Sequence, residues 1–294
     1  PVTMNAASMN NSGFEFSATY RNRDRDFKYE LSANLSTLRN RVTSLGFGTD
    51  SYISGAYITN VGQEIGQFYG WAYEGIARTQ EDLDNHATQE GAQIGDCLYK
   101  DISGPDGKPD GKVDANDQVV LGSGMPKIHF GLNARFEYKR FDLSIATFGA
   151  LNYHVSDDIY NSLNSCYGWG NKEVGMLDAN RFSEDGSTYL SNVPRTYVTN
   201  SASLGWNDLF SSRKIQNAAY WKIANVELGY NFPNEWFGKY VSDVRFYVSA
   251  QNLHTFTGYH GYNVDYAGGT FTPGYNFCSY PTARTFMCGV HFTF

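Results

Sequence analysis

The 294-residue sequence lacks any apolar run of about 20 residues, the length that a membrane-spanning helix requires. It has few cysteines, and these show neither a CxxC pattern nor the spacing of metal ligands. They are Cys97, Cys166, Cys278 and Cys288. Helical membrane proteins and zinc-finger-like scaffolds are therefore excluded.

The sequence also lacks the motifs of common enzymes and an excess of basic residues. It contains no GxSxG, HExxH or P-loop motif. Asp157 and Asp158 form a carboxylate pair, but adjacent residues on an extended chain point apart, which favours a solvated turn over a glycosidase pair. The net charge of -7 disfavours nucleic acid as a partner. We expect neither an enzyme nor a nucleic-acid-binding protein.

Aromatic residues and glycine, in contrast, are abundant. Aromatics make up 16% of the chain, with 22 Tyr and 20 Phe, and there are 30 Gly. A composition rich in these residues, without long apolar runs, is typical of β-rich chains. It also suits a transmembrane β-barrel, in which only every second strand residue must be apolar.

The stretch 284–294 (RTFMCGVHFTF) has the clearest two-residue periodicity. One face is apolar and consists of Phe286, Cys288, Val290, Phe292 and Phe294. The other face is small or polar and consists of Thr285, Met287, Gly289, His291 and Thr293. Such alternation indicates a strand between two different environments. The strand that closes an outer-membrane barrel has this form, and the alternative is an edge strand of a soluble β-sandwich.

Seven segments in total alternate in this way. They cover residues 13–20, 27–36, 128–138, 141–149, 221–231, 244–251 and 284–294. Their polar faces carry charge, at Glu15, Lys28, Glu30, Arg135, Glu137, Glu227 and Arg245. A row of charges is costly against a packed core but costs little against a wet lumen. The pattern therefore favours apolar faces toward lipid and polar faces toward a channel.

The connections between these strands alternate in length. Short turns cover residues 21–26, 139–140 and 232–243, and long loops cover residues 37–127, 151–219 and 254–283. Barrels have short periplasmic turns and long extracellular loops, so this order predicts a periplasmic C-terminus. Seven strands leave two open edges, and bacterial barrels use even strand numbers of about 8 or more. We therefore predict an all-β fold, the C-terminal portion of a large antiparallel transmembrane β-barrel.

Several stretches together resemble the C-terminal part of the SusC/RagA family of TonB-dependent outer-membrane transporters of Bacteroidetes. They include VGQEIGQFYGWAYEGI (61–76), YKDISGPDGKPDGKVDANDQVVLG (99–122), PKIHFGLN (126–133), FDLSI (141–145), YWKIANVELGYNFP (220–233), RFYVSAQNLHTFTGYHGYNVD (245–265) and YPTARTFMCGVHFTF (280–294). The resemblance implies a full barrel of roughly 22 strands, with the plug, the energy-coupling segment and the signal peptide upstream of this chain.

The same resemblance implies a function and partners. It implies multi-pass insertion in the outer membrane and TonB-driven import of glycans or oligopeptides. It also implies that a SusD-like surface lipoprotein covers the outer loops. Two alternatives remain: a barrel that is only a scaffold in an outer-membrane assembly, and a soluble β-sandwich that binds or hydrolyses carbohydrate. Detergent dependence and heat-modifiable gel mobility distinguish the barrel from the sandwich.

The acidic segment DGKPDGKVDAND (106–117) is similar to a calcium-binding loop. Ligand oxygens at loop positions 1, 5, 7, 9 and 12 would come from Asp106, Asp110, the Lys112 carbonyl, Asp114 and Asp117, with Gly111 at the turn. Lys108 stands where a ligand is expected, and Asp101 could supply the missing oxygen. The pattern predicts a structural Ca²⁺, and the alternative is a solvated acidic turn.

Aromatic side chains in the long loops are candidates for substrate contact. They are Tyr167, Trp169 and Trp206, together with Tyr259 and His260. Flat rings stack on sugars, so these residues could line a substrate path. The alternative is packing within the loops or contact with a lid protein. Trp236 and Phe237, close to a short turn, favour an interfacial aromatic girdle instead.

Overall fold

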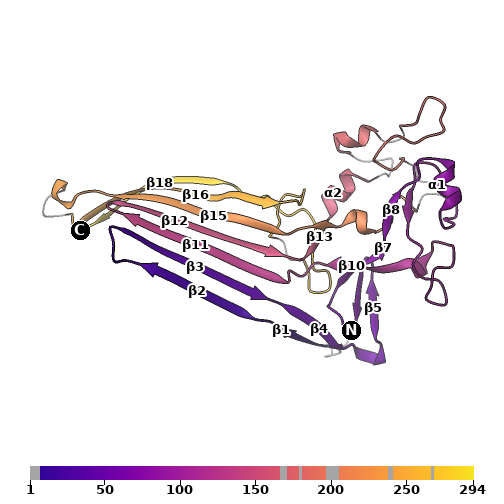
Figure 1. Cartoon of the computed structure of the whole chain (residues 1–294), viewed down its shortest axis with the longest axis horizontal. Helices are drawn as coiled ribbons and strands as arrows, with labels where there is room; N and C mark the ends of the chain where they lie inside the picture. Colours follow the sequence, from indigo (N-terminus) through magenta and orange to yellow (C-terminus); the bar gives the residue numbers. More distant parts are fainter. Residues whose placement is uncertain (1–6, 166–170, 179–180, 197–204, 238–240, 266–267) are drawn as a thin grey trace, which may run out of the picture.

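The chain is a long antiparallel sheet that leads at one end into a body of loops, short strands and short helices (Figure 1). The computed structural model describes residues 7–165, 171–178, 181–196, 205–237, 241–265 and 268–294. Tyr167 and Trp169 lie outside these described residues. No helix in the described part of the chain is both long and apolar enough to span a bilayer.

The main sheet contains seven strands in the spatial order β18-β16-β15-β12-β11-β3-β2. The strands are β2 (Glu15–Asn22), β3 (Phe27–Thr37), β11 (Ile128–Tyr138), β12 (Phe141–Leu151), β15 (Tyr220–Asn231), β16 (Asp243–Thr257) and β18 (Thr285–Thr293). All neighbouring pairs are antiparallel. The seven predicted strands and the all-β barrel-type fold are thereby confirmed, although β16 runs six residues beyond the predicted end at Gln251.

The predicted separation of the two faces also holds along the sheet. In register, Phe136 pairs with both Tyr29 and Leu143 on the apolar face. Large apolar side chains on this face are exposed, among them Leu132 at 47% and Phe286 at 70%. On the opposite face, Arg135 pairs with Glu30. The two faces of the sheet therefore differ in chemistry, one apolar and the other polar and charged.

Two irregularities in the sheet were not predicted. The register between β12 and β15 shifts next to Ala146, and Ala224 has no partner there. Beyond this bulge, Trp221 pairs with Gly149 and thus lies on the apolar face together with Val226. A second register shift lies between β15 and β16, next to Asn252, whose backbone is left-handed (φ 51°). It compensates for the first, so that Trp221 pairs with Phe256 on β16. Its result is a stacked Trp221–Phe256 pair, with ring centroids 5.3 Å apart.

The loop body is built from short strands. The first long loop contributes a four-stranded sheet, β10-β7-β6-β5, and the pair β8-β9. These strands are β5 (Ser51–Ser54), β6 (Tyr57–Asn60), β7 (Gln67–Trp71), β8 (Tyr73–Ile76), β9 (Cys97–Tyr99) and β10 (Gln118–Ser123). β4 (Arg39–Ser44) pairs with β1 (Ser8–Ser12), and β13 (His154–Asp157) joins β14 (Gln216–Asn217) to β17 (Tyr275–Asn276).

The helices are short. The α-helices are α1 (Gln80–Asn85) and α2 (Asp158–Leu163). Single 3-10 turns cover Gly46–Gly48, Ala115–Asp117, Val174–Asp178, Ser212–Lys214 and Asn234–Trp236. At α1 the Thr79 side chain accepts from the Asp82 backbone N–H, and the Asp82 side chain accepts from the Thr79 backbone N–H. This capping box stabilises the N-terminus of α1, which lies between β8 and β9.

Two buried clusters hold the loop body together. One joins the end of the main sheet to the second and third long loops, through Ala150, Tyr153, Val155, Ala218, Tyr220, Tyr259 and Val264. The other is centred on Cys97, Tyr99 and Val113, with Trp71, Tyr73, Ala87, Trp206 and Leu209 packed against it. The long loops thus have a core of their own, outside the sheet.

Candidate functional site

Charged side chains on the polar face of the main sheet form ion pairs across the strands. Arg21 bonds Glu30 at 2.7 Å between β2 and β3. Arg245 on β16 reaches Asp142 on β12 at 2.6 Å and Glu227 on β15 at 2.8 Å. Because these groups are only partly buried, they keep water contact while satisfying one another. A polar surface of this kind suits the wall of an aqueous channel.

Gly229 makes the Arg245 ion pair possible. It lies in register between Asp142 and Tyr247, directly under the path of the Arg245 side chain. A Cβ atom at this glycine would stand 2.4 Å from the Arg245 Nη2 atom and 2.5 Å from the Asp142 Oδ2 atom. Because Gly229 has no side chain, the Arg245 guanidinium can pass over β15 and reach Asp142 on β12.

Aromatic rings gather at both ends of the apolar face. At the short-turn end, Phe27 stacks on Phe136 with centroids 6.0 Å apart, and Phe232 contacts Trp236 at the same distance. Trp236 is 67% exposed. At the loop-body end lies the stacked pair of Trp221 and Phe256. Two such belts are typical of a surface that meets the two interfaces of a bilayer.

The acidic segment 106–117 folds as a tight turn whose carboxylates accept backbone N–H groups. Asp117 is fully buried and accepts from Ile102, Ser103 and Asp114. Asp101 accepts from Asp110 and Gly111. Hydrogen bonds of this type stabilise the turn in the same way that a metal ion would.

Two other predicted ligands have similar roles. Asp110 accepts from the Lys112 backbone N–H at 3.0 Å, and Asp114 caps the turn by accepting from Asn116 at 2.7 Å. Among the described residues, no group of three or more His, Cys, Asp or Glu side chains is arranged to hold a metal ion. As folded, these carboxylates accept backbone N–H groups, and Ca²⁺ binding stays a prediction.

The two predicted aromatic residues of the third long loop have different surroundings. Tyr259 is 5% exposed, and its hydroxyl donates to the buried Asp157 carboxylate, which also accepts from Asn276. Burial, followed by the bond to Asp157, raises the pKa of the Tyr259 hydroxyl, which keeps its proton. His260 is exposed and stacks on Tyr160, with ring centroids 5.9 Å apart. Tyr259 thus packs the loop core in this chain, while His260 faces solvent.

Trp206, the remaining predicted aromatic residue within the described part of the chain, packs against the second buried cluster, whereas Tyr259 belongs to the first. Its ring packs on Tyr99 with centroids 6.3 Å apart, and its indole N–H donates to the Glu90 carbonyl at 2.9 Å. It lines a hollow of about 680 Å³ together with Trp71. The described candidates therefore do not converge on one site, and sequence reasoning missed Trp71, although the resembling stretch 61–76 contains it.

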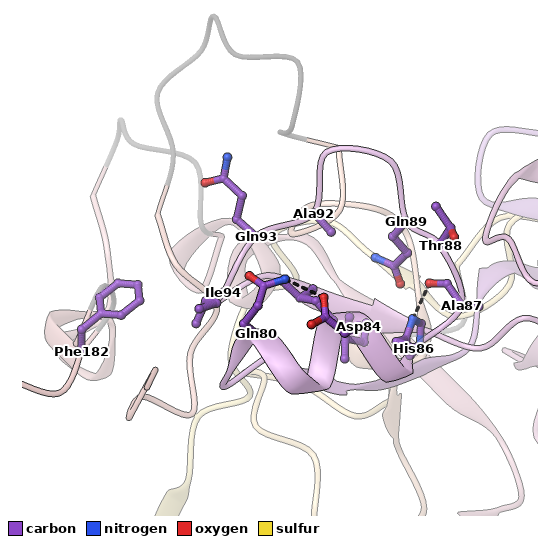
Figure 2. A pocket seen from close by; sticks show the side chains of 12 residues that line it. Gln80, Asp84, His86, Ala87, Thr88, Gln89, Ala92, Gln93, Ile94 and Phe182 are labelled. Atoms are coloured by element: carbon purple, nitrogen blue, oxygen red, sulfur yellow. Dashed lines mark hydrogen bonds between the residues drawn. The ribbon is translucent and has the colours of Figure 1, made fainter. Parts of the chain in front are cut away.

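A second, neighbouring groove has a volume of about 610 Å³ and is lined mainly by α1 and the segment after it. Figure 2 shows Gln80 and Asp84 side by side on α1, joined by a hydrogen bond of 2.9 Å. Phe182 approaches from the second long loop, and Gln93 points away from the helix. Gln93 also lines the tryptophan hollow, so the two cavities flank the same chain segment.

Buried polar contacts fix the walls of both cavities. Asp96 is fully buried and accepts from the Arg195 side chain at 2.6 and 3.0 Å. The Asn207 amide donates to the same carboxylate at 2.7 Å. Arg78 donates to the carbonyl of Tyr189 at 3.1 Å. These bonds span about a hundred residues of sequence and hold the first and second long loops in one arrangement.

Comparisons with known proteins agree on one family. The TonB-dependent receptor P3 of Formosa agariphila is 29% identical over 99% of this chain and 29% of the receptor. The TonB-dependent receptor SusC of Bacteroides thetaiotaomicron is 25% identical over the whole chain and 27% of that receptor. No protein-family model matches the chain.

Solved structures show the same fold. The RagAB peptide transporter matches with a TM-score of 0.75 and 21% identity, over 97% of this chain and 29% of that one. This chain therefore spans less than a third of the length of the two curated receptors that it matches. The predicted resemblance to SusC/RagA-like TonB-dependent transporters is confirmed.

Proposed function

We propose that this chain, which is similar to SusC/RagA-like TonB-dependent transporters over nearly all of its length, forms part of the wall of an outer-membrane importer. The apolar face of the main sheet meets lipid, and the polar face lines the lumen. The short turns lie in the periplasm, together with the C-terminus, and the loop body faces the outside. The imported substrate is a glycan or an oligopeptide.

The exposed apolar face of the main sheet carries this proposal. Leu132, Phe246 and Phe292 are exposed on it. On the opposite face, Arg245 pairs with Asp142 and Glu227. A strand of 11 residues such as β11 extends about 33 Å. Tilted as in membrane barrels, it covers a height of about 25 Å, which matches the apolar band of outer-membrane barrels.

The two unpaired edges of the main sheet indicate which partners this chain needs. Within the described residues, β2 and β18 each pair on one side only. Unpaired strand edges in lipid cost several kcal/mol per backbone group, so further strands of the same protein complete the barrel around a plug. TonB supplies energy through that remaining part, and a SusD-like lipoprotein covers the loop body.

Cysteine accessibility in the full-length protein tests this orientation. Four single-cysteine variants are made in a background without the native cysteines. They form two matched comparisons of neighbouring residues: Leu132→Cys against Asn133→Cys, and Val290→Cys against His291→Cys. In intact outer membranes, a charged thiol reagent should label the cysteines at 133 and 291 much faster than those at 132 and 290. Equal labelling, or faster labelling at 132 and 290, would contradict the proposal.

A further inference from the structure

The hollow between Trp71 and Trp206 is a binding site in its shape and chemistry. Its volume of about 680 Å³ falls within the range of small-molecule sites. Glu90, Asp114 and Gln93 line it together with the two indoles and Leu209. Glu90, Gln93 and Asp114 are exposed, so their polar groups remain accessible beside the rings.

Both indoles are held in fixed orientations. The Trp71 N–H donates to the Asp114 carbonyl at 3.0 Å, and the Trp206 N–H donates to the Glu90 carbonyl at 2.9 Å. Tyr99 packs beneath Trp206, and its hydroxyl donates to the Trp206 carbonyl. Neither ring loses much conformational freedom when a ligand binds, which favours affinity. The site is preorganised.

These contacts also determine what the hollow can bind. Since both indole N–H groups are already used, the tryptophans offer a ligand mainly their apolar faces. Beside them the Glu90 and Asp114 side chains are acceptors, the Gln93 amide can both donate and accept, and none of the residues that line the hollow is Lys or Arg. The complementary ligand therefore has flat C–H faces and many hydroxyl donors, and carries no negative charge.

We propose that the Trp71–Trp206 hollow binds a neutral saccharide chain on the outer loops. Pyranose rings stack on the indoles, and their hydroxyls donate to the carboxylates of Glu90 and Asp114. An anionic saccharide is disfavoured by these carboxylates. A peptide backbone is disfavoured too, because its carbonyls need donors, the indole N–H groups are already used, and Gln93 is the one other side chain of the lining that carries N–H groups. This inference rests on the proposed import function for its placement outside the cell.

Calorimetry on the full-length protein in detergent tests the inference, with maltohexaose, cellohexaose, xylohexaose and mannohexaose as neutral probes. At least one should bind saturably, and Trp206→Ala should weaken its binding about tenfold or more. Glu90→Gln should weaken it less, because the Glu90 carbonyl that holds Trp206 is retained. Trp236→Ala, an exposed tryptophan at the opposite end of the sheet, is the matched control and should leave binding unchanged.

Several results would overturn the inference. They are no binding of any neutral probe up to about 10 mM, unchanged binding in both Trp206→Ala and Glu90→Gln, or tighter binding of hexagalacturonate or hexa-alanine. If Trp206→Ala does not fold, Trp206→Phe and Glu90→Gln decide the question. The proposed place of this chain in the wall of an importer is tested separately, because the cysteine labelling pattern does not depend on whether a saccharide binds.

Discussion

At the scale of single residues, Gly229 controls an ion pair in which it does not take part. The Arg245 guanidinium donates to Asp142 at 3.0 and 2.6 Å by passing over this glycine. Gly229→Ala should displace the flexible end of Arg245 and destabilise the full-length protein by about 1 kcal/mol, since the pair is only partly exposed. Urea unfolding in lipid measures this change.

The matched control for Gly229→Ala is Gly75→Ala on β8, where an added Cβ meets open space. We expect this variant to be neutral within about 0.5 kcal/mol. In an Arg245→Gln background the effect of Gly229→Ala should become smaller, and what remains should come from the close approach of the added Cβ to the Asp142 Oδ2 atom. An equal loss of stability with and without Arg245 would show that the glycine acts through the backbone alone.

The sequence predicted the polar character of these residues but not their partners. The alternation placed Glu227 and Arg245 on one wet face, because each side chain's face follows from a period of two. It did not identify Asp142 as the partner of Arg245, since the pairing depends on strand register. Register is a tertiary property that no local pattern encodes.

At the scale of elements, the acidic turn 106–117 can bind calcium only by giving up hydrogen bonds. Its carboxylates already accept backbone N–H groups, so we expect Ca²⁺ to bind the full-length protein weakly, with a Kd of about 1 mM. Asp110→Ala and Asp114→Ala should each abolish the calorimetric signal, and Glu81→Ala on α1 should not. A titration without heat would leave the segment as a solvated turn.

Elements differ in how far local sequence defines them. The seven long strands were predictable because each alternates over six or more residues. The bulge at Ala224 was not, because a single extra residue moves Trp221 to the other face without any local signal. The short strands of the loop body were not predictable, since they depend on contacts between distant segments such as that of Asp96 with Arg195.

At the scale of the whole molecule, the open edges of β2 and β18 and the apolar face demand a closed barrel in lipid. The full-length protein should therefore need detergent for solubility and migrate faster in unheated than in heated gel samples, as folded barrels resist dodecyl sulfate. A sample that stays monomeric without detergent and shows identical mobility before and after boiling would support the soluble β-sandwich instead.

The buried Asp96 has a consequence for how the loop body can change in evolution. Its carboxylate pairs with Arg195, about a hundred positions away in the sequence. Replacing either partner alone would therefore leave a buried charge unpaired. Natural chimaeras that acquire a new ligand preference should then inherit both segments as a block. Transferring only the segment that contains Asp96, or only the one that contains Arg195, between paralogues would misfold the loop body and would not change its specificity.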